Sequence, residues 1–338
     1  MNATFAFTVT LKQAGTFLLT CLRTAIPYLQ PKQWQALLLE EQHAKEIRGS
    51  IKVDGIIVHH DVVLSAGQIV SYTINDYQEA EVDCAWSLIW SNADIAAIHK
   101  PANLPVNRTT RNVYNTLIQL LRRESPWADA HLLHRLDLET SGIMLIAQNK
   151  AIARQYQSRL SDLIERKLYR AVVIGEPGWV VNDVTCDLAT LEESEGGTAI
   201  RSQMHVVPEG KGKKSRTLFK LLSTIQQEGV SYSLIECELF TGRKHQIRAQ
   251  LAHLGHPIVG DKIYSNGGEF YLKRIAKTAS VDDYAALLAP HHLLHAYEIH
   301  LNNSCSLERA QAKDKTTQQQ GIILRDDNFP AAWQSFVF

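Results

Sequence analysis

The chain has no excess charge of either sign and no long apolar run. Its 338 residues include 35 Lys and Arg against 35 Asp and Glu, so bulk charge does not mark a nucleic-acid binder. A neutral total still leaves room for a local basic groove. No run reaches the roughly 18 apolar residues that a membrane helix needs, so no membrane partner is expected. A hydrophobic content of 45% supports a sizeable core and excludes a disordered chain.

Cysteines are also few. The five cysteines lie far apart and form no C-x-x-C pair, which argues against a disulfide framework and against a structural zinc site. The first residues lack a leading basic region and alternate as in a strand, so they do not resemble a signal peptide. These features predict reduced thiols and a soluble, cytoplasmic protein.

Motifs for nucleotide cofactors and metals are missing as well. No Gly-x-Gly-x-x-Gly or Gly-x-x-x-x-Gly-Lys-Ser/Thr string occurs, so a nucleotide-cofactor fold has no support. The histidines at 59–60 and 291–295 lack the H-E-x-x-H arrangement of a zinc hydrolase. We therefore expect neither a metal nor a cofactor.

The length predicts two domains, at roughly 100–200 residues each. Residues 1–75 show a strand, two helical stretches, an Asp-Gly hairpin and a further strand, which predicts a small α/β module. The acidic stretch 76–83 is either a linker or a solvated loop. Residues 84–338 mix short strand-like runs with helical stretches near 113–123 and 150–164 and show no regular βαβ repeat, which indicates an α+β domain. The polar tail at 308–321 predicts a loop.

The most distinctive string is His134-Arg135-Leu136-Asp137, followed by Thr140-Ser141-Gly142 and an apolar strand. A cation beside Asp137 keeps the acid ionised, and an ionised carboxylate can act as nucleophile or base. An ordinary surface Arg–Asp pair is the more frequent explanation of such a string. Chemistry alone therefore leaves both interpretations open.

Three further segments carry basic side chains. The segment 241–248 could bind phosphate or carboxylate, or could simply begin an amphipathic helix. The segment 165–171 places a tyrosine among cations, where it could stack on a base or only pack. The segment 211–216 has four cations and no acid, and is either a phosphate-binding loop or an unliganded surface loop.

In their order along the chain, these strings resemble the RluA-type family of RNA pseudouridine synthases. The string 134–142 is similar to the family's signature, Lys167-Leu168-Tyr169-Arg170-Ala171 to its Lys-x-Tyr-x-Ala strand, and 241–248 matches nearly residue for residue. His99-Lys100-Pro101-Ala102 precedes them, and Gly255-His256-Pro257-Ile258, Gly260-Asp261, Tyr264 and Leu294-His295-Ala296 follow in the family's order. The resemblance spans about 90–300.

The resemblance implies a mixed, mostly antiparallel sheet with a central catalytic cleft, preceded by the small module at 1–75. It also implies isomerisation of specific uridines in ribosomal or transfer RNA to pseudouridine. This reaction has no net redox change, in keeping with the expected absence of a cofactor. A monomer is expected because the RNA supplies the second surface. The implied RNA-binding residues are Arg135, His134, Lys167, Arg243, Lys244, His245, Lys213, Lys214 and Arg216.

The resemblance assigns the catalytic roles to three residues. Asp137 is the essential carboxylate, which attacks or deprotonates the ribose. Tyr169 packs against the target base and helps to remove the proton from carbon 5. Arg248 pairs with Asp137 and holds it ionised. Arg135 enters the RNA stack where the target uridine leaves. The apolar strand 142–147 is expected to wall a pocket that keeps water off the intermediate.

Some features depart from the family's pattern. Asn103 stands where the family favours Gly, so that loop is expected to bend differently. The module 1–75 carries six Lys and Arg against five acids, which is poor for gripping phosphate and suggests a degenerate RNA-binding domain. Two alternatives remain open. One is an RNA-binding or RNA-folding protein with subordinate catalysis, and the other is an Asp-nucleophile hydrolase on a small substrate.

Overall fold

The structure is a computed structural model that describes residues 2–25, 29–39, 48–109, 111–191, 200–302 and 321–338. All but the last residue of the predicted polar tail lies outside these ranges. The chain forms two compact units. The first contains Met1–Glu81 and Arg108–Asn115, and the second contains Val82–Asn107 and Thr116–Phe338.

The N-terminal unit is a four-stranded antiparallel sheet, in the order β1-β4-β2-β3, with two helices. Buried Trp34 packs edge-on against Tyr72 at a ring-centroid distance of 5.0 Å. Asp54 and Gly55 have φ of 52° and 82°, which the predicted Asp-Gly turn requires. The elements are β1 (Ala3–Thr8), α1 (Leu18–Ala25), α2 (Pro31–Leu39), β2 (Arg48–Val53), β3 (Ile56–Ile57) and β4 (Ile69–Asn75).

A later segment returns to this unit. The carboxylate of Glu79 accepts the backbone N–H groups of Val113, Tyr114 and Asn115 at 2.5 to 2.8 Å. Val113 is buried in the core of the N-terminal unit. Helix α3 (Leu117–Glu124) therefore begins later than the helical stretch expected at 113–123.

The second unit is built on one mixed sheet in the order β11-β10-β12-β13-β9-β14-β8-β6-β5, with β15 beside β14 and β7 beside β8. Among the described strand pairs only β14 and β8 run parallel, so the predicted mostly antiparallel α+β fold is confirmed. Its strands are β5 (Ser87–Ser91), β6 (Ile95–Lys100), β7 (His131–Leu132), β8 (Ser141–Ala147), β9 (Ile164–Ile174), β10 (Val181–Ala189), β11 (His205–Val207), β12 (Lys213–Gln227), β13 (Val230–Leu239), β14 (Leu294–Leu301) and β15 (Ile322–Arg325).

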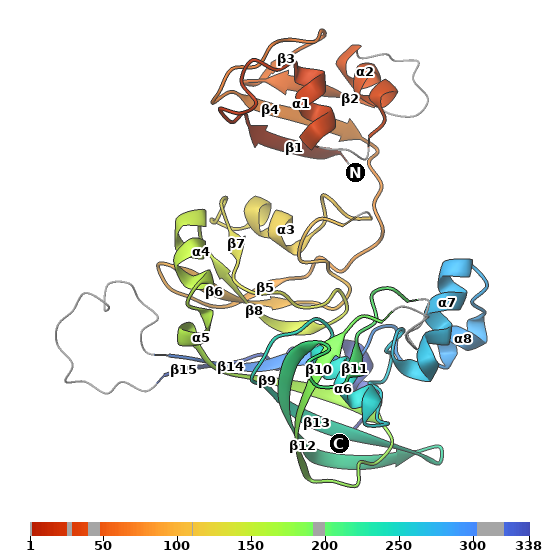
Figure 1. Ribbon diagram of the computed structural model, residues 1–338. Helices are drawn as coiled ribbons and strands as arrows, with labels where there is room; N and C mark the ends of the chain where they lie inside the picture. The colour runs from red at the N-terminus through yellow and green to blue at the C-terminus, as the bar shows by residue number, and fades with distance from the viewer. Residues whose placement is uncertain (1, 26–28, 40–47, 110, 192–199, 303–320) are drawn as a thin grey trace, which may run out of the picture. The chain divides into compact units, whose positions relative to one another are not determined.

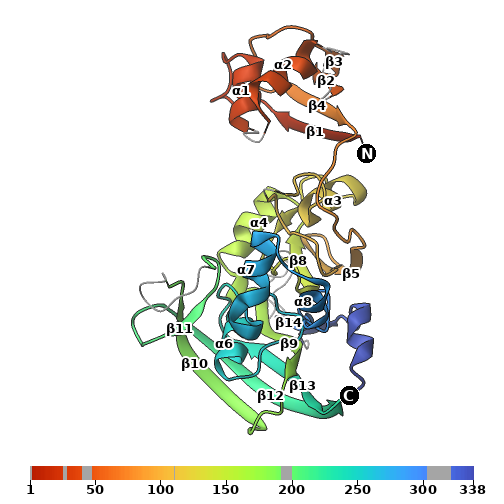
Figure 2. The ribbon, with the colours of Figure 1, turned by 90° about the vertical axis from the view of Figure 1, so that its right-hand side faces the viewer.

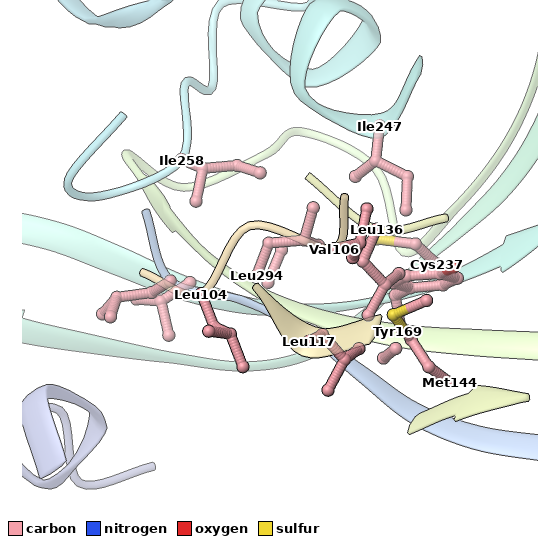
Figure 3. Packing of buried hydrophobic residues seen from close by; sticks show 14 of the residues in the cluster. Leu104, Val106, Leu117, Leu136, Met144, Tyr169, Cys237, Ile247, Ile258 and Leu294 are labelled. Carbon is pink, nitrogen blue, oxygen red and sulfur yellow. The ribbon is translucent and has the colours of Figure 1, made fainter. Parts of the chain in front are cut away.

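Helices cover both faces of this sheet around β8. Met144 and Ile146 of β8 join one buried cluster with α3, whereas Ile143 and Leu145 join another with α4. Helix α6 packs against the long strands, as Figure 2 shows, and its Ile247 lies in the same cluster as Leu136 (Figure 3). The remaining helices are α4 (Lys150–Gln157), α5 (Leu160–Leu163), α6 (Gln246–His253), η2 (Ser265–Gly268), α7 (Glu269–Ala276), α8 (Val281–Ala285) and η3 (Ala331–Ser335).

Gly142 is where β8 meets its parallel neighbour. Its φ is 109°, and a Cβ there would lie 2.3 Å from the carbonyl oxygen of Ala296 in β14. Only glycine fits this combination of backbone conformation and close approach. The glycine of the Thr140-Ser141-Gly142 string thus fixes the place where the loop carrying Asp137 enters the sheet.

Candidate active site

Asp137 lies in the loop between β7 and β8, with 29% of its side chain exposed. Leu136 beside it is buried in the core, whereas Arg135 and Leu138 are exposed. The apolar side chain anchors the loop to the sheet, and the carboxylate stays at a pocket wall.

Arg248 of α6 holds the carboxylate of Asp137. Its Nη1 donates to Oδ2 of Asp137 at 2.8 Å, and its Nε and Nη2 donate to the two oxygens of Asp261 at 2.7 and 3.0 Å. Oδ1 of Asp261 also accepts the backbone N–H groups of Ile263 and Tyr264. The predicted Asp137–Arg248 pair is present in the structure, and Asp261 orients the guanidinium from the other side.

Both carboxylates stay ionised. Burial by itself raises the pKa of Asp261, but the charge and hydrogen bonds of Arg248 oppose it and the pKa falls to about 2. At Asp137 burial is again the largest effect, Arg248 leads the opposing ones, and the pKa lies below its usual value. The pocket therefore holds a carboxylate anion at neutral pH.

The two oxygens of Asp137 differ in their partners. Oδ2 accepts from Arg248 and lies 3.8 Å from Nε2 of His245. No group among the described residues hydrogen-bonds to Oδ1. Because Oδ1 keeps its lone pairs, it is the oxygen that can attack a carbon or take a proton.

Asp137 faces a pocket of about 460 Å³. The strand 142–147 was expected to wall it, and this expectation is wrong. Strand β8 is fully buried behind the loop that carries Asp137, so its side chains do not reach the pocket. The apolar wall comes instead from Leu133, Leu136, Leu160, Leu239, Ile247 and Leu294.

Tyr169 of β9 lines the same pocket and is 8% exposed. Burial and, to a lesser degree, the negative charge of Asp137 raise the pKa of Tyr169 well above its usual value. Its phenol therefore keeps its proton at neutral pH. It can offer a ring face or a hydroxyl to a ligand, but not a preformed phenolate.

His245 and His134 also line the pocket, as neutral imidazoles. Burial lowers the pKa of each to about 4. Nε2 of His134 accepts the backbone N–H of Leu145 at 3.0 Å, which ties the start of the loop to β8. Lys167 lies near them, and burial lowers its pKa too. RNA contacts from these three side chains would be with a nucleotide inside the pocket.

The exposed cations Arg135 and Arg243 form part of the pocket lining. Lys244 is exposed beside Arg243 but is not part of the lining. Nε of Arg243 donates to the backbone carbonyl of Lys214 at 3.0 Å. This contact connects the pocket rim to the basic segment 211–216.

The segment 211–216 was predicted as a loop, but most of it is a strand. Lys213, Lys214 and Arg216 lie on β12, which pairs with β10 over this stretch. Their side chains are exposed and do not line the pocket. Arg216 forms a two-pronged ion pair with Asp183 across the strands and lies 4.4 Å from the ring centroid of Phe240.

Buried polar contacts brace the Asp137 loop from behind. Nζ of fully buried Lys100 donates to the carbonyl oxygens of Pro101, Leu104 and Leu138 at 2.7 to 3.0 Å. The ammonium group thus joins the turn after β6 to the residue next to Asp137. Asn103 within that turn has a φ of 58°, the left-handed conformation that a Gly would also adopt.

A second brace connects the loop to the turn that carries Asp261. Glu139 forms an ion pair with Lys262 and lies 3.5 Å from Nδ1 of His292. His292 Nε2 in turn contacts the hydroxyl of Thr140 at 2.8 Å. Asp261 and Lys262 are adjacent, so one turn positions both the partner of Arg248 and the loop of Asp137. Sequence reasoning noted the Gly-Asp pair but assigned it no role.

Metal and membrane features are absent from the part of the chain that the structure describes. No group of three His, Cys, Asp or Glu side chains there could hold a metal ion. No helix in it is both long and apolar enough to cross a bilayer.

Known proteins that resemble this chain identify its family. A family model described as RNA pseudouridylate synthase matches residues 94–253. An uncharacterized RNA pseudouridine synthase of Synechocystis is 32% identical over 69% of this chain and 78% of its own length. The chain belongs to the RluA-type family of RNA pseudouridine synthases. It is accordingly an isomerase that acts on RNA.

Other relatives match this chain less closely or over a smaller share of their own length. The ribosomal large subunit pseudouridine synthase D of Xylella fastidiosa is 29% identical over 67% of this chain and 66% of its own. Three longer relatives are covered over only 36% to 61% of their length. The solved structure of human RNA pseudouridylate synthase domain containing 1 shares the fold, with a TM-score of 0.51 and 20% identity over 74% of this chain and 86% of that one.

Proposed function

We propose that this synthase isomerises defined uridines of ribosomal RNA, with transfer RNA as the second substrate class to test, and that Asp137, Tyr169 and Arg248 carry the reaction. One observation supports the assignment most strongly. A carboxylate held on one oxygen by a buried arginine leaves its other oxygen open to a pocket beside a buried tyrosine. The name of the Xylella relative favours ribosomal RNA.

The proposed reaction begins with the target nucleotide outside the RNA stack. Flipping a base costs a few kcal/mol, and exposed Arg135 at the pocket rim can fill the gap by stacking its planar guanidinium. Oδ1 of Asp137 then attacks the ribose carbon that carries the base, or takes a proton from the ribose, as the bond to N1 of uracil breaks and its electron pair leaves with the uracil; Arg248 keeps Oδ2 occupied. The uracil turns, and its carbon 5 bonds to the same ribose carbon as Asp137 leaves or returns the ribose proton. The proton of carbon 5 is lost and N1 gains one, so the product is an isomer. Tyr169 supports the detached uracil with its ring. Because its phenol is protonated, any proton it moves passes through the hydroxyl.

The RNA backbone would follow the cations at the pocket rim and on β12. Lys213, Lys214, Arg243 and Lys244 have exposed side chains, and Arg243 touches the backbone of Lys214. Each lost phosphate contact should weaken binding and reduce the salt dependence by about one unit of slope. His134, Lys167, His245 and Arg216 complete the proposed RNA-binding set. We expect a monomeric enzyme in the cytoplasm, and the N-terminal unit as a weak RNA-binding module.

Pseudouridine mapping tests the proposal. Ribosomal and transfer RNA from the source cell are compared with RNA from a strain that lacks this protein. We expect one or a few pseudouridines to disappear and to return with the wild-type copy. Asp137→Asn should not restore them, whereas Asp282→Asn, the same change at an exposed acid of α8, should. An unchanged map would contradict the proposed substrates and favour an RNA-binding protein.

A further inference from the structure

His245 carries a hydrogen-bond donor that no described residue uses. Its side chain is 10% exposed and lines the pocket, and its Nε2 lies 3.8 Å from Oδ2 of Asp137. That separation is too long for a direct hydrogen bond. The other ring nitrogen, Nδ1, contacts the hydroxyl of Tyr264 at 3.1 Å.

The contact with Tyr264 determines which ring nitrogen carries the proton. The Tyr264 oxygen already accepts the backbone N–H of Met204 at 2.8 Å. Burial keeps the pKa of Tyr264 well above its usual value, so the hydroxyl has a proton to donate. Nδ1 of His245 is its acceptor among the described residues. A neutral imidazole that accepts at Nδ1 carries its proton on Nε2.

Nε2–H and Oδ2 of Asp137 thus present a donor and an acceptor that a small group can bridge. An oxygen about 2.8 Å from each can span the gap of 3.8 Å if it lies about 2 Å to the side of the line between them. The bridging group must both accept from His245 and donate to the carboxylate. A hydroxyl does this, whereas a uracil carbonyl only accepts and would face the anion's lone pairs.

We propose that His245 recognises the 2′-hydroxyl of the target nucleotide, which bridges Nε2 of His245 and Oδ2 of Asp137. This inference rests on the proposed function, because it places the ribose beside Asp137. The 2′-hydroxyl adjoins the carbon at which the base is attached, and Oδ1 of Asp137 stays free for the reaction. The pocket wall would then distinguish RNA from DNA at the target itself.

The test uses an RNA fragment of about 20 nucleotides around the uridine found by mapping. The fragment carries either uridine or 2′-deoxyuridine at the target. Dissociation constants come from fluorescence anisotropy, and pseudouridine formation from mass spectrometry. Wild-type enzyme should bind the uridine fragment about tenfold more tightly, the size of one hydrogen bond to a polar partner.

His245→Ala should reduce this discrimination, because the hydroxyl keeps only its hydrogen bond to Oδ2 of Asp137. It should bind the uridine fragment several-fold more weakly and the deoxyuridine fragment unchanged. His245 has a φ of 53°, so His245→Asn, which tolerates this conformation, controls for backbone strain. His245→Gln keeps an N–H donor and should retain part of the discrimination. Tyr264→Phe removes the donor to Nδ1 of His245, so the ring proton can move from Nε2 to Nδ1 and the discrimination should fall.

The outcomes separate this inference from the proposed function. If His245→Ala weakens both fragments equally, or discriminates like the wild type, recognition by His245 is wrong while the enzyme's activity stands. If the wild-type enzyme forms no pseudouridine in the uridine fragment, the proposed function itself fails. Melting temperatures of all variants identify any that are merely misfolded.

Discussion

Asp261 is a buried acid whose two oxygens both receive hydrogen bonds from Arg248, at 2.7 and 3.0 Å. In Asp261→Asn the amide oxygen can still accept the backbone N–H groups of Ile263 and Tyr264. The amide nitrogen, however, then faces a guanidinium N–H, donor against donor. Breaking a buried ion pair from one side costs about 3–5 kcal/mol. For a domain of this size that lowers the melting temperature by roughly 10 °C.

The same substitution should reduce turnover, because Arg248 loses the partner that aims it at Asp137. A displacement of about 1 Å at a catalytic group can cost on the order of 100-fold in rate. Single-turnover pseudouridine formation measures this loss, and thermal unfolding measures the stability. Asp183→Asn is the matched control for stability, since it breaks the exposed pair with Arg216 and should lower the stability far less. Equal stability losses in the two variants, or normal turnover of Asp261→Asn, would refute the reasoning.

Three more perturbations follow from the same contacts. Gly142→Ala should lower the free energy of unfolding by about 3 kcal/mol and remove most of the activity, because its Cβ would lie 2.3 Å from the Ala296 oxygen. Chemical denaturation measures the loss of stability, and a stable, active variant would contradict the prediction. Lys100→Met leaves three carbonyl oxygens without their donor, so the free energy of unfolding should fall by about 3 kcal/mol in the same assay and turnover should slow. An unchanged unfolding transition would count against this prediction. Burial lowers the pKa of four histidines from the ordinary value of 6.5 to about 4. Their contribution to stability is therefore full above pH 6.5 and is lost as the pH falls toward 4. Urea unfolding between pH 7.5 and 4.5 should show this decline, and a flat profile would argue against it; the four are His134, His245, His292 and His295.

The elements near the site could largely be predicted because their signals are local. Strand β8 is an unbroken apolar run, and the Asp-Gly turn of the N-terminal unit depends on two adjacent residues. The start of α3 was predicted too early, because the residues before it belong to the other unit. The basic stretch on β12 was taken for a loop because the strand that pairs with it, β10, lies far away in the sequence.

The site residues likewise fall into those that the sequence predicted and those that it did not. The resemblance implied Asp137, Tyr169 and Arg248 because their strings match a family pattern, and the structure brings all three to one pocket. Asp261, Lys100 and Glu139 also lie in matching strings, but the resemblance assigned them no role. Each acts through a partner remote in sequence. The partners of a carboxylate depend on which groups lie close to it in the folded chain, and the order of residues along the sequence does not give these distances.

Motif order along the chain was enough for the family, the class of fold and the three side chains proposed for the chemistry. Only folding decides which oxygen of Asp137 stays open, which nitrogen of His245 carries the proton, and which residues wall the pocket. The physical reason is that hydrogen bonds act over about 3 Å, and residues far apart in sequence meet at that range only once the chain has packed.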